Sequence, residues 1–145
     1  MKTYIFDIDG TIANNDHRQH HLTKTPKDWS SWHKESQEDK PYWEIIDILM
    51  MARANGIKIV LCTGRDEKCR EDTEQWLINH SIYYDDLFMR ARDDRRDDDD
   101  VKKDLLAKIR KLGYNPVCVF EDRARVVKMW REEGLRCLQV APGDF

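Results

Sequence analysis

Short apolar runs alternate with longer stretches of helical periodicity along the chain. Five runs are rich in β-branched and aromatic residues and almost continuous in hydrophobicity, which is typical of strands buried on both faces of a sheet. They predict strands at 3–8, 58–62, 87–89, 117–120 and 136–140, with helices between them at about 42–55, 67–80, 99–112 and 123–133. This alternation predicts an α/β fold with a Rossmann-like parallel sheet of about five strands flanked by helices.

Glycines mark the expected ends of these elements. Gly56, Gly113 and Gly134 each follow a predicted helix, where a left-handed residue commonly ends the last turn. Gly10 and Gly64 each follow a predicted strand, where a tight turn favours glycine. The glycine positions therefore agree with the division into strands and helices.

The segment 13–41 interrupts the alternation. It is polar, contains Pro26 and Pro41, and is too long for a plain connection between a strand and a helix. We expect it to form a small cap inserted after the first strand. Its tryptophans, Trp29 and Trp32, either pin this cap onto the rest of the chain or stack on a nucleobase.

Length and composition fit one globular domain over residues 1–145. Hydrophobic residues make up 40% and charged residues 37%. No apolar run approaches the roughly 20 residues of a membrane span, and acids break the first run too early for a signal peptide, so we expect a cytoplasmic protein. The net charge of −3 argues against non-specific nucleic-acid binding by charge alone. The four cysteines form no CxxC pair, so neither disulfides nor structural zinc are expected.

Polar side chains follow three of the predicted strands, at the edge where parallel sheets bind their ligands. They are Asp7, Asp9, Gly10 and Thr11 after the first strand, Thr63, Gly64 and Arg65 after the second, and Glu121, Asp122 and Arg123 after the fourth. Three separate parts of the chain thus bring acids, a hydroxyl group and arginines to one edge of the sheet.

These residue types suit phosphoryl transfer. Two nearby like charges, Asp7 and Asp9, raise the cost of ionising each other unless a cation lies beside them, and Mg²⁺ binds through one or two carboxylates plus substrate phosphate. Asp122 can supply the second carboxylate. One carboxylate can also attack phosphorus while another transfers protons. Thr63, the backbone at Gly64, and a lysine at 102 or 103 can neutralise the transferred group.

Four segments resemble, in order, the motifs of the haloacid dehalogenase-type phosphatases. They are DIDGT at 7–11, TGR at 63–65, Lys102, and ED at 121–122. The resemblance extends over nearly the whole chain. It implies the haloacid dehalogenase-type version of the Rossmann-like fold.

The resemblance also implies a role for each residue. Asp7 is then the nucleophile, and Asp9 the general acid and base. Thr63 and Lys102 hold the phosphoryl group. Asp7, Asp122 and the backbone carbonyl of Asp9 bind Mg²⁺, the expected cofactor.

A narrower resemblance concerns the substrate. The segments 63–77, 95–106 and 126–145 are similar to the 3′-phosphatase half of phage polynucleotide kinase–phosphatases. This resemblance implies a polynucleotide 3′-phosphatase that acts on DNA or RNA ends. Its register favours Lys102 over Lys103.

One position departs from that pattern. The family often has aspartate where this chain has Glu121, so we assign the metal to Asp122 and expect Glu121 to support the ligands from behind. By resemblance, substrate contacts are expected from Gly64, Arg65, Arg90, Arg92 and Arg123. Which of Arg92, Arg95 and Arg96 face the substrate is open, and the acidic run after them is expected to be a solvated helix start.

Each motif by itself also has a structural explanation. DxDG can be a turn, TGR can lead into a helix capped by Asp66, Lys102 can be a solvated helix residue, and Asp122 can cap a helix. His17, His20 and His21 are expected at the surface or facing substrate rather than on a metal.

Two other functions are considered. One is a small-molecule phosphatase or nucleotidase whose cap encloses a mononucleotide. The other is a non-catalytic module that binds nucleic-acid ends. The phosphate-binding loop of a kinase is missing among the six glycines, so we expect a stand-alone phosphatase, favoured by Met1, or the excised half of a larger protein. A separate kinase or ligase partner is left open.

Overall fold

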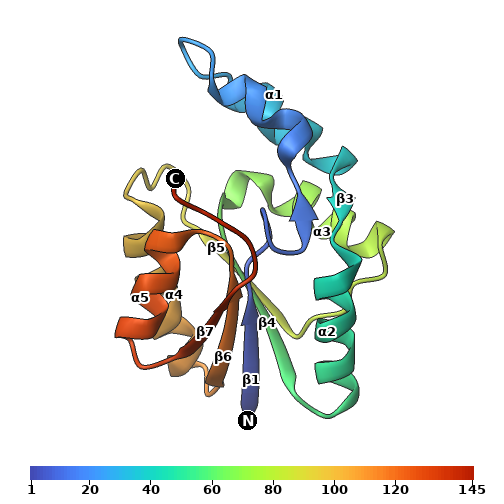
Figure 1. The fold of residues 1–145 in the computed structure, drawn as a ribbon, viewed down its shortest axis with the longest axis vertical. Helices are drawn as coiled ribbons and strands as arrows, with labels where there is room; N and C mark the ends of the chain where they lie inside the picture. The colour runs from blue at the N-terminus through green and yellow to red at the C-terminus, as the bar shows by residue number, and fades with distance from the viewer.

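The computed structural model describes all residues from 1 to 145 and contains a parallel sheet between two layers of helices (Figure 1). The strands of this sheet are β1 (Lys2–Phe6), β4 (Lys58–Asp66), β5 (Asp86–Arg90), β6 (Asn115–Glu121) and β7 (Arg136–Gln139). They lie in the order β5-β4-β1-β6-β7, and every neighbouring pair is parallel. The predicted α/β fold with a five-stranded parallel sheet is confirmed.

Two hydrophobic cores lie on opposite faces of the sheet. One is covered by α2 (Trp43–Ala54) and α3 (Arg70–Asn79), and the other by α4 (Asp98–Lys111) and α5 (Ala124–Glu132). Neighbouring residues of β1 point to different cores, Ile5 to one and Phe6 to the other. This explains why the strands are apolar at consecutive positions. Trp76 and Trp130 are fully buried, one in each core.

The element bounds agree with the sequence prediction to within three residues except near Gly64. The strand β4 runs four residues beyond 62, to Asp66, and its pairing with β5 is irregular between Thr63 and Asp66. Gly64 therefore lies inside the strand and not in a turn after it. A Cβ atom at this position would overlap the Asp98 carboxylate, so a larger residue here would displace this side chain of α4.

Residues 13–41 form the cap inserted after β1. Its base is a pair of antiparallel strands, β2 (Ala13–Asn14) and β3 (Lys40–Pro41). Between them lie the 3₁₀ helix η1 (Asp16–Leu22), the helix α1 (Trp29–Lys34) and the 3₁₀ helix η2 (Glu35–Glu38). Figure 1 shows the cap, in blue, beyond the carboxyl edge of the sheet. No helix of the chain is long and apolar enough to cross a membrane.

Candidate active site at the carboxyl edge of the sheet

Two adjacent strands bring three acids together. Asp7 follows β1, while Glu121 ends β6 and Asp122 follows it, and these strands are neighbours in the sheet. The three side chains are buried, and oxygen atoms from all three carboxylates lie within 4.8 Å of one another. The hydroxyl group of Thr11 lies 3.3 Å from Asp7 Oδ2 and 3.4 Å from Asp122 Oδ1. Asp7 and Asp122 are therefore close enough to share one cation.

A buried lysine completes this cluster. The ammonium group of Lys102, on α4, lies 2.9 Å from Asp7 Oδ1 and 2.9 Å from Glu121 Oε2, and the residue is 1% exposed. Asp98, one turn earlier on the same helix, lies 3.4 Å from this ammonium group. The adjacent Lys103 points to the surface and pairs with Glu133 at 3.3 Å. The structure thus places Lys102, and not Lys103, beside Asp7.

The strand β4 supplies the next part of the site. Leu61 pairs with Phe6 in the sheet, so Thr63 lies just beyond the carboxyl end of β1, at the same edge of the sheet as Asp7. Thr63 is buried, and its Oγ1 accepts a hydrogen bond from the backbone N–H of Arg65 at 3.1 Å. The hydroxyl proton of Thr63 remains available to a ligand at this edge.

Asp9 is held by two arginines. Arg65 donates through Nε and Nη2 to its two carboxylate oxygens, at 3.0 and 2.7 Å, and Arg18 of the cap donates through Nη2 at 2.6 Å. Both arginines also contact the buried Asp39, Arg18 at 2.8 Å and Arg65 at 3.4 Å. This network of alternating charges ties the cap to the edge of the sheet. Neither Arg18 nor Asp39 belongs to a sequence motif, so no local pattern predicts their part in this network.

The pKa of Asp9 is low despite its burial. Desolvation by itself would raise the pKa of the Asp9 carboxyl, but the charges and hydrogen bonds of Arg65 and Arg18 outweigh it and lower the pKa to about 2. Asp9 is therefore an ionised carboxylate at neutral pH.

The pKa values of Asp7, Glu121 and Asp122 are raised, in contrast to that of Asp9. Burial, followed by the negative charge of Glu121, raises the pKa of Asp7 well above its usual range despite the Lys102 charge. Burial and the charge of Asp7 raise the pKa of Asp122 to about 7. Burial likewise raises the pKa of Glu121. One lysine does not offset three crowded carboxyl groups, so a divalent cation between Asp7 and Asp122 would relieve their repulsion, and the residues present fit Mg²⁺.

Several predicted substrate-binding arginines are instead engaged within the chain. Arg65 contacts Asp9 as described. Arg90 donates to the backbone carbonyls of Gly64 and of the loop after β5, at 2.6 to 3.0 Å. Arg123 donates to the carbonyl of Phe145 at 2.6 Å, beside the site. Arg92 is exposed on the loop after β5. Of the arginines expected at the substrate, Arg92 has the most freedom to meet a ligand.

The histidines of the cap make internal pairs. His17 Nε2 lies 2.7 Å from Asp39 Oδ1, and His21 Nε2 lies 2.9 Å from Glu35 Oε2. Nitrogen atoms of His20 and His21 lie within 4.8 Å of each other and of a Glu35 oxygen. These contacts join η1 to the rest of the cap.

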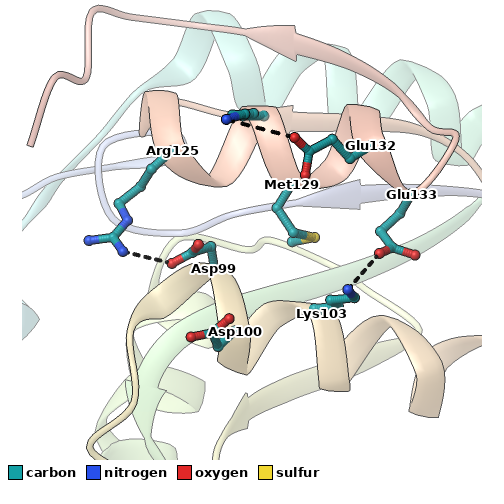
Figure 2. Close-up of a pocket in the computed structure, with 8 residues that line it drawn as sticks. Asp99, Asp100, Lys103, Arg125, Met129, Glu132 and Glu133 are labelled. Atoms are coloured by element: carbon teal, nitrogen blue, oxygen red, sulfur yellow. Dashed lines mark ion pairs between the residues drawn. The ribbon is translucent and has the colours of Figure 1, made fainter.

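A separate hollow of about 170 Å³ lies between α4 and α5 (Figure 2). Opposite charges pair across it, Arg125 with Asp99 at 3.1 Å and Lys103 with Glu133 at 3.3 Å, as the dashed lines in Figure 2 show. Because most of its charges are paired with each other, we interpret the hollow as a junction between the two helices.

Replacing Arg18 by methionine should weaken the fold at neutral pH. The substitution leaves Asp39 and Asp9 with Arg65 as their main positive partner, and loss of one member of a buried ion pair costs about 3 kcal/mol. We expect urea unfolding at pH 7 to show this loss for Arg18→Met, and little change for Arg53→Met on the surface.

The same loss should depend on pH. The pKa of Asp9 lies below its value in the unfolded chain, so its stabilising contribution is present above about pH 4 and disappears as the pH falls toward 2. The difference between Arg18→Met and the parent should shrink over this range. If the stability difference between Arg18→Met and the parent were equal at pH 7 and pH 2, the proposed role of the Asp9 charge in this network would be wrong.

The match of the whole chain to a phosphatase-domain family model, together with the fold, identifies it as a haloacid dehalogenase-type phosphatase. A class C acid phosphatase from Bacillus anthracis has the same fold, with a TM-score of 0.69, 16% identity, and 99% of this chain and 67% of that chain covered. The family model of the polynucleotide kinase PNKP phosphatase domain matches residues 1–145. The chain belongs to this family, and the resemblance to polynucleotide kinase–phosphatases is confirmed.

Two relatives are longer proteins that this chain matches over part of their length. A chain in the structure of a Pnkp1/Rnl/Hen1 complex is 34% identical with a TM-score of 0.85, and the match covers 99% of this chain and 47% of that chain. A putative bifunctional polynucleotide kinase/RNA ligase of Autographa californica nuclear polyhedrosis virus is 27% identical over 133 residues, 90% of this chain and 18% of that protein. This chain therefore spans less than half the length of either relative.

Proposed function

We propose that this chain is a Mg²⁺-dependent polynucleotide 3′-phosphatase that repairs nucleic-acid ends by converting a terminal 3′-phosphate to a 3′-hydroxyl group. The observation that carries the reaction type is the buried cluster in which Lys102 lies 2.9 Å from Asp7, with Asp122 beside it. Membership in the polynucleotide kinase PNKP phosphatase family and the similarity to a putative kinase/RNA ligase support a nucleic-acid substrate.

In the first step, an Asp7 oxygen attacks phosphorus and the bond from phosphorus to the 3′-oxygen breaks, so that an aspartyl-phosphate forms. The leaving oxygen takes a proton from Asp9. Lys102 and Thr63 donate hydrogen bonds to the phosphoryl oxygens, whose negative charge is spread over three positions in the transition state. Lys102 is already in place for this role because its ammonium group contacts the nucleophile.

In the second step, a water molecule attacks the phosphorus of the aspartyl-phosphate while Asp9 accepts a proton from this water. The bond between phosphorus and the Asp7 oxygen breaks, and inorganic phosphate is released. The resting carboxylate form of Asp9 is the form that this step needs. In the first step Asp9 has to carry a proton, and the negative charge of a bound phosphate favours this because a nearby like charge raises the pKa of a carboxyl group.

Asp7, Asp122 and the Asp9 carbonyl would hold Mg²⁺, with Glu121 orienting Lys102 behind them. When bound, the ion neutralises phosphate charge and the repulsion between the two aspartates. Gly10 matches this arrangement, since a Cβ atom at that position would overlap the Asp122 carboxylate.

Phosphate release from matched substrates tests the proposal. We expect faster release from 3′-phosphorylated oligonucleotides than from 5′-phosphorylated ones or from 3′- and 5′-mononucleotides, and none after EDTA treatment. DNA and RNA versions should be compared. Faster hydrolysis of the free mononucleotides would instead identify a nucleotidase. Binding without turnover would identify an end-binding module.

Mg²⁺ should also stabilise the folded chain. A ligand that binds only the folded state raises the melting temperature, and we expect about 5 °C at a Mg²⁺ concentration far above Kd. Asp122→Asn should remove this shift. Asp100→Asn, in the exposed acidic group at the start of α4, is the control and should keep it. Loss of the shift in Asp100→Asn alone would place the ion elsewhere.

A further inference from the structure

Trp29 is an exposed aromatic side chain that the cap holds in a defined position. It is 49% exposed, whereas Trp32, on the same short helix, is 8% exposed. The edge of one ring packs on the other, with 5.6 Å between centroids and 81° between planes. The ring of Trp29 is also nearly parallel to that of His33, at 6.2 Å and 28°. These contacts fix the ring and leave part of it open to a flat partner.

Packed side chains connect this ring to the site. The guanidinium group of Arg18 donates to Asp9 at 2.6 Å and lies 4.0 Å from the centroid of the Trp32 ring. Trp32 in turn packs against Trp29. Trp29 therefore lies at the outer end of a continuous path from Asp9. This path begins at Asp9, two residues after the proposed nucleophile Asp7.

The face of α1 that carries Trp29 also faces the sheet domain. His33 is one turn after Trp29 and shares its face of the helix. His33 Nδ1 lies 3.2 Å from Cys69 Sγ, in the 3₁₀ helix η3 (Glu67–Cys69). At the start of η3, Asp66 accepts a hydrogen bond from the backbone N–H of Asp93 at 3.0 Å. Thus η3 lies between the cap and the loop after β5.

That loop carries two cations without partners. Arg92 and Arg95 are exposed and make no ion pair or hydrogen bond, whereas Arg96 pairs with Asp94 at 2.9 Å. On the cap, the ammonium group of Lys27 lies 5.7 Å from the centroid of the Trp29 ring. Proteins that bind single nucleic-acid strands commonly combine these two features, because the bases stack on aromatic rings and the phosphates pair with cations.

We propose that Trp29 stacks on a nucleobase in the last two nucleotides of the phosphorylated strand, while Arg92 and Arg95 bind the phosphates that precede it. This inference rests on the proposed function and names a subsite of the same active site. The base is unpaired, since bases within a duplex stack on each other and are not open to an aromatic side chain. The subsite binds any base, because every base offers a flat face.

Steady-state kinetics with two 3′-phosphorylated single strands test the subsite. One strand is complete, and the other lacks the bases of its last two nucleotides. Stacking contributes roughly 1–3 kcal/mol per base, so for the parent chain we expect KM to be about tenfold lower for the complete strand. Trp29→Ala should raise KM for the complete strand by about tenfold, leave kcat unchanged, and have no effect on the abasic strand. Trp29→Phe should keep most of the preference.

Trp43→Ala is the matched control. This tryptophan is 47% exposed at the start of α2, and its ring packs against His80, which follows α3. Its removal should leave the preference for the complete strand intact. An equal rise in KM for both strands in Trp29→Ala would indicate a structural role and overturn the proposal, as would equal KM values of the parent for the two strands. If the parent released no phosphate from either strand, the proposed function itself would fail.

Discussion

Asp7→Asn abolishes phosphate release and leaves the fold intact. This is the expected result because the amide cannot attack phosphorus, and removal of a nucleophile lowers kcat by about a thousandfold or more. The buried carboxylate is also unfavourable, since its pKa is raised by desolvation and by the charge of Glu121. Lys102 keeps its contact with Glu121 at 2.9 Å, so the melting temperature should be equal to or higher than that of the parent.

A trapping experiment separates loss of chemistry from loss of binding. With a substrate labelled on the phosphate, acid quenching during turnover should leave label on the parent chain and none on Asp7→Asn. Asp47→Asn, an exposed aspartate on α2, is the control and should behave like the parent. Turnover by Asp7→Asn at the parent rate would exclude the aspartyl-phosphate mechanism.

Lys102→Met loses both activity and stability. The substitution removes the cation that lies 2.9 Å from both Asp7 and Glu121, and breaking such a buried pair costs about 3 kcal/mol or more in the free energy of unfolding. The transferred phosphoryl group also loses a charged donor, so kcat should fall by at least about a hundredfold. Urea unfolding and phosphate release, measured side by side, check the two effects.

The stability loss should depend on pH when divalent ions are removed. The pKa values of Asp7 and Glu121 are already raised, and without the lysine they rise further. Protonation at pH 5 then neutralises the acids, so the loss should be larger at pH 8 than at pH 5. Lys103→Met removes only a surface pair with Glu133 and should cost little. An equal loss in the free energy of unfolding for Lys102→Met and Lys103→Met would contradict the assignment of Lys102 to the site.

Local patterns in the sequence were sufficient for the fold. Strands buried on both faces leave continuous apolar runs, and helices between them make the sheet parallel, so the edge that carries Asp7 and Asp122 followed from the alternation alone. The convergence of Asp7, Glu121 and Asp122 within 4.8 Å agrees with that reasoning. The location of short motifs at strand ends can be predicted from sequence because the strand determines at which edge of the sheet the next residues lie.

The contacts within the cap could not be predicted from local sequence patterns. Arg18 and Asp39 lie 21 positions apart, on either side of α1, and meet at 2.8 Å only because β2 and β3 pair at the base of the cap. Arg90 was expected at the substrate, yet its guanidinium group binds backbone carbonyls of its own loop and of Gly64. A sequence shows which side chains carry charge, but the partner of each charge depends on contacts between distant segments.

The sequence by itself determined the sheet, its ligand-binding edge and the set of acids there, because each depends on short-range periodicity and on the chain direction of parallel strands. The tertiary structure decided that Lys102 and not its neighbour contacts Asp7, that Asp9 is held between Arg65 and Arg18, and that Trp29 is exposed while Trp32 is buried. These outcomes depend on which side chains exclude water from one another when the cap, β4 and α4 pack together, and burial of this kind leaves no local pattern.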